Sequence, residues 1–264
     1  NERPRITRYQ VYQQLQGELS SREIEEHLEM MPEDYLATVQ PERIVLHLHL
    51  TRSLDGKLFV LHQQFNEKVG YHSITLCSVA GEETFKKMVG SLTANNLNIL
   101  GAQVYLRRDG VILITIQVDG HGESDQTIDL EHVFPDLEKN LEDVLENRKD
   151  IRDLLKSRKR YVVGKNKPRP ITPKIQIDNT TSPAYTVVRV EARDHIGMLY
   201  KIAKILADFQ VQIHRAKIAC KGDRGVDVFY VTLRDTKITF KHLTRRIKEN
   251  LINVLLSEQL EDLN

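Results

Sequence analysis

Tyr71-His-Ser-Ile-Thr-Leu-Cys77 has a counterpart in Tyr185-Thr-Val-Val-Arg-Val-Glu191, which lies 114 residues further along the chain. The offset persists through the apolar positions that follow, which pair as Phe85 with Leu199, Met88 with Ile202, Leu92 with Leu206, Ile99 with Ile213, Ala102 with Ala216 and Val104 with Ile218. After one extra residue in the second copy, residues 111–116 fall on residues 226–231. A period this long indicates a duplicated domain rather than a solenoid. A pair of small domains is typical of a sensor.

Composition indicates an ordinary water-soluble protein with room for two domains or a little more. The chain has 264 residues, 40% of them hydrophobic, and a net charge of +1. No apolar run approaches the roughly 20 residues that cross a bilayer, and no signal-like segment occurs, so no membrane partner is expected. The first residue is Asn1 rather than methionine, which favours a fragment. Cys77 and Cys220 are not equivalent in the repeat, which predicts reduced thiols in a cytoplasmic protein.

Residues 1–57 are predicted to form a helical segment. Ser20 and Glu23 match a capping box, and Pro41 suits the first position of a helix. The segment has few hydrophobic residues for an independent fold, so it is expected to pack on another part of the protein.

Each copy is predicted to contain a strand, a helix, a hairpin of two strands and a second helix. The first domain is expected at residues 58–158, with paired strands near 58–65 and 71–78, an Asp109-Gly110 hairpin turn and a long helix over about 137–157. The second is expected at residues 185–264. One further strand per copy gives the split βαβ arrangement. The predicted fold class is therefore α+β: two ferredoxin-like βαββαβ domains preceded by a short helical segment.

Residues 159–184 are basic and rich in proline, which predicts an extended linker between the two copies. A nucleic-acid or nuclear-localisation patch is the alternative. The linker is favoured, and no nucleic-acid partner is expected, because Tyr161 is the only aromatic residue near the charges and the chain is almost neutral.

No catalytic residues and no metal site are predicted from the motifs. The sequence has no His-Asp pair, no D-x-D, no phosphate-binding loop, no G-x-G-x-x-G, no H-E-x-x-H and no C-x-x-C. His47 and His49 would point to different faces of a helix, so a solvated or packing role is favoured for them.

The second copy contains a loop with the chemistry to bind a ligand. In Ala192-Arg-Asp-His-Ile-Gly-Met-Leu199 a strand is expected to turn into a helix, and Gly197 permits a tight turn. The N–H groups at the start of that helix suit a carboxylate, and Asp194 suits an ammonium group. The alternative is that Asp194 only caps the helix.

The equivalent segment of the first copy is Val79-Ala-Gly-Glu-Glu-Thr84. The apolar positions around it match those of the second copy, but the residues suited to binding a ligand are replaced. Ala80 replaces Asp194, and Glu83 replaces Gly197. A carboxylate there would repel an anionic ligand. Any ligand loop is therefore predicted in the second copy.

The split βαβ repeat with an Asp-x-x-Gly turn resembles the ACT domain, a regulatory module that binds small molecules. Residues 178–179, 185–188, 192–200 and 225–231 resemble the last domain of the bacterial PII uridylyltransferase/uridylyl-removing enzymes. Residues 97–102 are similar to a strand of the preceding ACT domain in that family, and residues 35–50 to the end of its HD domain.

This resemblance implies a regulatory region of a larger enzyme. In the family, one domain transfers UMP to a tyrosine of the PII signalling protein, an HD domain removes it, and glutamine binding to the ACT region switches between the two activities. Mg²⁺ is expected for the absent catalytic domains and no cofactor for this chain. The alternative is a ligand-free ACT assembly module, with self-association through the ACT domains.

The resemblance also implies a place for the ligand, because ACT domains commonly pair side by side. The ligand would lie between the loop of the second copy and one strand of the first, contacted by Asp194, His195, Ile196, Gly197, Met198, Asn98, Ile99 and Leu100. Asn98 would bind a side-chain amide, although it is equally well explained as a strand start. Ile213, His214 and Asp227 are interpreted as core, packing or surface residues rather than ligand contacts.

Overall fold

Helices and strands occur in three groups along the chain. The computed structural model describes residues 2–68, 70–79, 81, 83–119, 130–156, 171–195, 197–221 and 224–261. The first group is purely helical and comprises α1 (Glu2–Gln14), α2 (Ser21–Met30), α3 (Tyr35–Thr38) and α4 (Pro41–Leu54). Ser20 and Glu23 form the predicted capping box, and Pro41 occupies the first turn of α4.

The second group is a four-stranded antiparallel sheet with its helices. It contains β1 (Phe59–Asn66), β2 (Tyr71–Ser78), α5 (Thr84–Ala94), β3 (Asn98–Leu106), β4 (Ile112–Asp119), α6 (Leu130–Leu145) and α7 (Ile151–Lys156). The strand order is β1-β2-β4-β3. Gly110, with φ of +87°, closes the predicted hairpin between β3 and β4. The single helix expected over 137–157 is instead α6 and α7, separated where Asn147 takes a left-handed φ of 58°.

The third group repeats the second. It contains β5 (Lys174–Asp178), β6 (Thr186–Arg193), α8 (Met198–Asp208), β7 (Val211–Lys221), β8 (Arg224–Leu233) and α9 (Lys241–Glu261), with strand order β5-β6-β8-β7. Even an irregularity is shared, because a bulge lies between Ile99 and Gly101 in β3 and between Ile213 and Arg215 in β7. The structure therefore contains the duplicated domain that the sequence predicts.

The predicted class, two ferredoxin-like α+β domains, is confirmed, with one difference in chain order. The fourth strand of each sheet comes first in its domain, so each domain reads ββαββα instead of βαββαβ. Both chain orders place an antiparallel strand at the same edge of the sheet, beside β2 in the first domain and β6 in the second. A strand that precedes β2 or β6 reaches this edge through a short connection, and a strand that follows the last helix would reach it by returning along the sheet.

The strand order corrects one domain boundary. Residues 174–178 fall within the segment predicted as linker, yet they form β5 and pair with β6. Ile175 is buried while Lys174 and Gln176 are exposed, so the strand alternates as an edge strand does. Nearby prolines and charges obscured this short alternation. The part of the linker over residues 157–170 lies outside the described residues.

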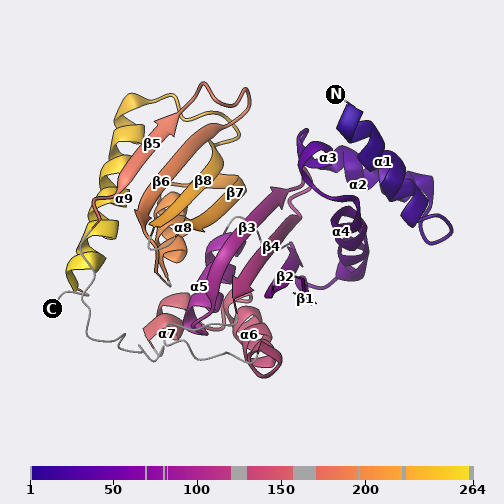
Figure 1. Ribbon diagram of the computed structural model, residues 1–264, viewed down its shortest axis with the longest axis horizontal. Helices are drawn as coiled ribbons and strands as arrows, with labels where there is room; N and C mark the ends of the chain where they lie inside the picture. The colour runs from indigo at the N-terminus through magenta and orange to yellow at the C-terminus, as the bar shows by residue number, and fades with distance from the viewer. Residues whose placement is uncertain are drawn as a thin grey trace.

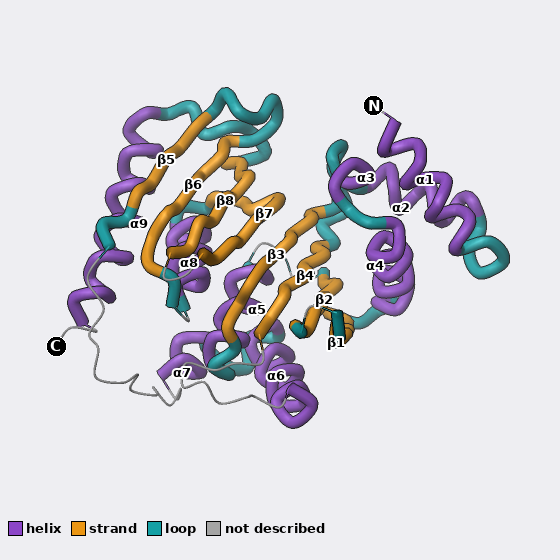
Figure 2. The backbone as a smooth tube through the Cα atoms, viewed as in Figure 1, coloured by secondary structure: helices purple, strands orange, loops and turns teal. Residues whose placement is uncertain are grey.

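The two sheets meet through equivalent elements (Figures 1 and 2). Edge strands β3 and β7 lie side by side, and α5 packs on α8. A Cβ placed on Gly101 of β3 would lie 3.7 Å from the carbonyl oxygen of Ile218 on β7, so the two backbones are close. One hydrophobic cluster runs through both domains beneath the helices.

The helical segment covers the other face of the first sheet. Cys77, Tyr105 and Leu113 are buried beneath it, which confirms that the segment packs on another part of the protein. Inside this contact the Tyr35 hydroxyl and His47 Nδ1 lie 2.6 Å apart, and burial lowers the pKa of His47 to about 3. His47 is therefore neutral and has a packing role. Among the described residues no helix has both the length and the apolar character needed to cross a membrane.

Candidate functional site

The loop between β6 and α8 has a backbone conformation that requires glycine. Gly197 has φ of +102°, in the left-handed region, and α8 begins at the next residue, Met198. The Met198 N–H donates to the carbonyl oxygen of His195 over 3.1 Å, which closes the turn. The following N–H groups of a helix have no acceptor within the helix, so the loop presents donors at the start of α8.

This loop faces β3 across a small cavity of about 20 Å³. The lining comprises Thr93, Leu97, Asn98, Ile99, Asp194, His195, Gly197, Met198, Leu199, Ile218 and Asp227. Six of the eight residues proposed from the sequence are therefore in one place, although they come from two domains. That they bind a ligand stays a prediction.

The other two proposed residues are Leu100 and Ile196. Leu100 is the unpaired residue at the bulge in β3 and does not line the cavity. Ile196 lies outside the described residues.

Asp227, on β8, is the residue that the sequence interpretation missed. Its side chain is fully buried at the cavity, and neither carboxylate oxygen has a hydrogen-bond partner within the described part of the chain. Burial, and then the charge of Asp194, raise the pKa of Asp227 to about 8. A buried carboxyl without partners is costly, so it is a strong indication of a ligand.

A signal for Asp227 was present in the sequence. In β8 it shares the inward face with Phe229 and Val231, because alternate residues of a strand point the same way. The sequence alignment of the two copies sets it against Ile112, whereas the strand registers set it against Ile114; both are apolar residues of β4. Strand alternation and the repeat together predict an inward carboxyl in an apolar core.

The backbone of β8 passes close to the loop before α8, which brings the carboxyl groups of Asp194 and Asp227 to one cavity. A Cβ on Gly225 would lie 2.7 Å from Met198 Cε and 3.8 Å from Asp194 Oδ1, so glycine lets β8 pass directly beside the loop. The site then presents carboxylates, helix N–H groups and the Asn98 amide around an apolar wall. These groups match the ammonium, the carboxylate and a polar side chain of an amino acid.

The equivalent loop of the first domain is built differently. Gly81 takes the left-handed conformation there, with φ of +90°, and Glu83 precedes α5 with helical backbone angles. Glu83 forms an ion pair with Lys86. Ala80 lies outside the described residues.

The other residues that the sequence left aside have packing contacts. Ile213 packs against the core, and His214 Nε2 lies 2.7 Å from Thr232 Oγ1 while its ring packs on Tyr185. No group of three or more His, Cys, Asp or Glu residues that could hold a metal ion occurs among the residues for which the structure gives a description.

Comparison with protein families finds the ACR9-like, ACT-like domain over residues 174–260. That range begins at β5, in agreement with the corrected boundary. Among solved structures, aspartate kinase from Synechocystis aligns with 70% of this chain and 27% of its own, at 10% identity and a TM-score of 0.39.

Among curated proteins the chain is similar to bifunctional uridylyltransferase/uridylyl-removing enzymes. Identity is 28% to that of Nitrobacter winogradskyi over 91% of this chain and 26% of the relative. It is 26% to that of Azospirillum brasilense over the same shares, and 31% to that of Gluconobacter oxydans over 71% of this chain and 20% of the relative. The chain thus spans about a quarter of these relatives. The similarity confirms the resemblance found in the sequence.

Proposed function

We propose that this chain is the regulatory ACT region of a bifunctional uridylyltransferase/uridylyl-removing enzyme, and that glutamine binds between its two ACT domains. The similarity of 91% of the chain to a quarter of such an enzyme supports the first part. The activities on the PII protein, their Mg²⁺ requirement and a cytoplasmic location belong to the whole enzyme and extend this proposal.

The observation that carries the ligand proposal is the buried, unpartnered carboxyl group of Asp227 beside Asp194. An ammonium group placed between them would give both carboxylates a partner and would favour the charged form of each. The ligand carboxylate would then meet the N–H groups at the start of α8. An α-amino acid carries both groups, an ammonium for the two carboxylates and a carboxylate for the N–H groups of α8.

Charge and hydrogen bonding favour glutamine over glutamate. Asn98 lies at the β3 side of the cavity, where its amide can donate to and accept from a second amide. A glutamate side chain would add a further carboxylate to a site that already has the carboxylates of Asp194 and Asp227 and the ligand's own α-carboxylate.

The size of the cavity implies that binding moves the two domains. About 20 Å³ is room for roughly one water molecule, whereas ligand pockets are commonly several hundred Å³. Glutamine must therefore widen the gap between the loop and β3. A ligand that favours the wider arrangement shifts the population toward it, which is the thermodynamic requirement for regulation.

The closed cavity is also what favours the second candidate, an assembly module that binds no ligand. In that case β3, β7, α5 and α8 would serve only to hold the domains together. The two candidates differ in whether the chain binds an amino acid.

Isothermal titration of the chain with glutamine and with glutamate tests the proposal. We expect saturable binding of glutamine, at least tenfold weaker binding of glutamate, and loss of binding in Asp194→Ala. Asp227→Ile, which copies Ile114 at the same register position of β4 in the first domain, should also lose binding. Asp235→Asn is the matched control, because Asp235 is exposed and lies in a turn after β8.

Two results would reject the ligand assignment. One is absence of glutamine binding by a folded chain, which would favour the assembly module. The other is unchanged affinity in both Asp194→Ala and Asp227→Ile, which would place the ligand elsewhere.

A further inference from the structure

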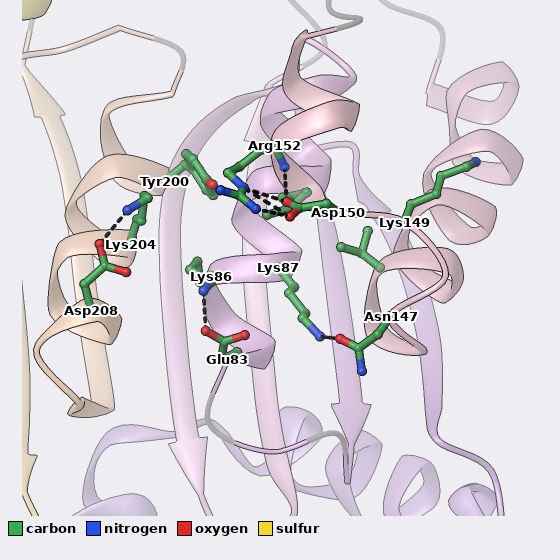
Figure 3. A pocket seen from close by; sticks show the side chains of 12 residues that line it. Glu83, Lys86, Lys87, Asn147, Lys149, Asp150, Arg152, Tyr200, Lys204 and Asp208 are labelled. Atoms are coloured by element: carbon green, nitrogen blue, oxygen red, sulfur yellow. Dashed lines mark hydrogen bonds and ion pairs between the residues drawn. The ribbon is translucent and has the colours of Figure 1, made fainter.

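A second and larger cavity opens on the helical side of the contact between the two domains (Figure 3). It has a volume of about 370 Å³ and lies between α5, α7 and α8. Residues of both domains line it: Glu83, Lys86, Lys87, Val144, Asn147, Lys149, Asp150, Ile151, Arg152, Tyr200, Lys204 and Asp208. The volume falls within the range of small-molecule sites.

The two cavities lie at opposite ends of the α5–α8 contact. The small cavity involves Thr93 near the end of α5 and Met198 at the start of α8. The large one involves Glu83 just before α5 and Asp208 at the end of α8. The two helices therefore run antiparallel, and the large cavity is separate from the proposed amino-acid site.

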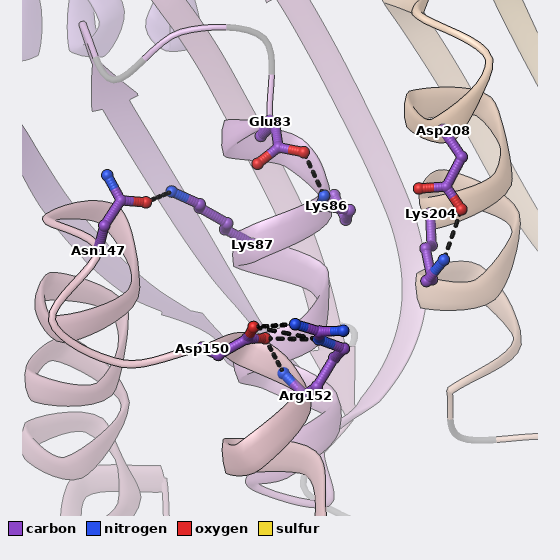
Figure 4. Close-up of polar contacts among 8 residues, drawn as sticks. All are labelled: Glu83, Lys86, Lys87, Asn147, Asp150, Arg152, Lys204 and Asp208. Carbon is purple, nitrogen blue, oxygen red and sulfur yellow. Dashed lines mark hydrogen bonds and ion pairs between the residues drawn. The ribbon is translucent and has the colours of Figure 1, made fainter.

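Most charges around the large cavity are already balanced by neighbours (Figure 4). Glu83 pairs with Lys86, Asp150 with Arg152 at 2.6 Å, and Lys204 with Asp208 at 2.5 Å. Lys149 pairs with Asp143, which lies outside the lining, at 2.6 Å. These pairs account for every charged side chain of the lining except one.

Lys87 is the exception. Its residue is only 9% exposed, and its Nζ donates to the neutral Asn147 Oδ1 over 2.8 Å. It has no carboxylate partner in an ion pair within the described part of the chain. Burial lowers its pKa by more than the charge of Glu83 raises it. A buried cation with only a neutral partner is costly, and an anion in the cavity would remove that cost.

We propose that this cavity binds the phosphate group of a small phosphorylated molecule, with the Lys87 ammonium as its anchor. The lining carries five cationic side chains against three carboxylates, so the cavity as a whole favours a dianion. Lysine binds phosphate as a point charge, and Lys86 and Lys204 can turn from their half-exposed carboxylate partners toward a stronger one. The proposal does not depend on the amino-acid site.

Such a ligand would connect the two domains. Lys86 and Lys87 belong to α5 of the first domain, and Lys204 belongs to α8 of the second. A phosphate group held by both helices strengthens the α5–α8 contact. Binding therefore stabilises the arrangement in which the domains are closed on each other.

The test uses the full chain with inorganic phosphate and pyrophosphate as probes, at constant ionic strength set with sodium chloride. We expect saturable binding in calorimetry and a higher Tm with either probe. Lys87→Met should weaken binding at least tenfold, since a charged hydrogen bond is lost. Lys204→Met should weaken it by a smaller factor.

The controls separate this site from general charge effects and from the amino-acid site. Lys139→Met removes an exposed lysine of α6 and should leave phosphate binding unchanged. Asp194→Ala should also leave it unchanged. Lys87→Met replaces a buried ammonium group with an apolar side chain of similar shape, so the variant should fold at least as stably as the unmodified chain.

The proposal is overturned if neither probe binds saturably, or if Lys87→Met binds them with unchanged affinity. A Tm increase that sodium chloride reproduces at equal ionic strength would also overturn it.

Discussion

The two sheets have the same strand order, and they differ in what covers their outer faces. In the first domain Cys77 is fully buried beneath the helical segment. Its repeat counterpart in the second domain, Glu191, is half-buried and pairs with Arg189 at 2.9 Å. The difference shows how a duplicated frame can be put to two uses. The first domain buries both faces of its sheet, whereas the second keeps a polar outer face and the candidate ligand loop.

The largest expected effect comes from exchanging this pair of residues. Cys77→Glu places a carboxylate in the contact between the first sheet and α4, which should lower the free energy of unfolding by about 4 kcal/mol. Chemical denaturation followed by circular dichroism measures the change.

The reciprocal variant is the control for this exchange. Glu191→Cys removes a partly exposed ion pair and should change the free energy of unfolding by less than about 1 kcal/mol. Equal effects of the two substitutions would contradict the view that the two outer faces differ in burial.

The next prediction concerns the pH dependence of stability that Asp227 adds to the second domain, where the first domain has an apolar residue. The pKa of Asp227 is raised to about 8, so the folded protein binds a proton that the unfolded chain releases near pH 4. Its contribution to stability is complete below about pH 4 and is lost as pH rises through about 8. Asp227→Asn lacks this titration.

Measurement of Tm for both proteins at pH 5 and pH 8.5 tests this sign. The Tm of Asp227→Asn relative to that of the unmodified chain should be higher at pH 8.5 than at pH 5. The change corresponds to a few kcal/mol in the free energy of unfolding. Asp194 is the charged neighbour that raises the pKa, so Asp194→Asn should reduce the dependence. A difference that is constant with pH would show that Asp227 is ionised throughout.

The smallest effect concerns the α5–α8 contact, where Gly90 is the repeat counterpart of Lys204. A Cβ on Gly90 would lie 2.6 Å from Ile151 Cγ1 and 3.0 Å from the Tyr200 ring. Gly90→Ala should therefore lower the free energy of unfolding by about 1–2 kcal/mol, although alanine usually stabilises a helix. Lys204→Ala, at the equivalent position of α8, should have an effect within about 0.5 kcal/mol. Stabilisation by Gly90→Ala would mean that the α5–α8 contact can accommodate a methyl group at this position without strain.

The fold was predictable because apolar periodicity recurs at one offset in both copies. Ile74 and Val188, for example, are fully buried at equivalent places in β2 and β6. Chain order was harder, since strand pairing depends on distant residues. Lys174–Asp178 has only five residues among prolines and charges, so its alternation was too short to be read as a strand.

The candidate site was predictable in part for a related reason. Asp194 and Gly197 belong to one turn, whose local sequence specifies its conformation. Asn98 was placed only through the pairing that the resemblance implied. The charge state of Asp227 depends on burial by residues of several elements, and no local pattern expresses that. A position-by-position comparison of the two copies would still have marked Asp227 as unusual.

The early position of the edge strand decides where the chain can be divided. A fragment that starts at Tyr185 would lack β5 and leave the edge of β6 that faces β5 unpaired, which invites aggregation between molecules. A cut between residues 156 and 171 leaves β5 with its own sheet. Protein engineers who wish to graft the second domain onto another protein should therefore carry over the short strand that precedes it.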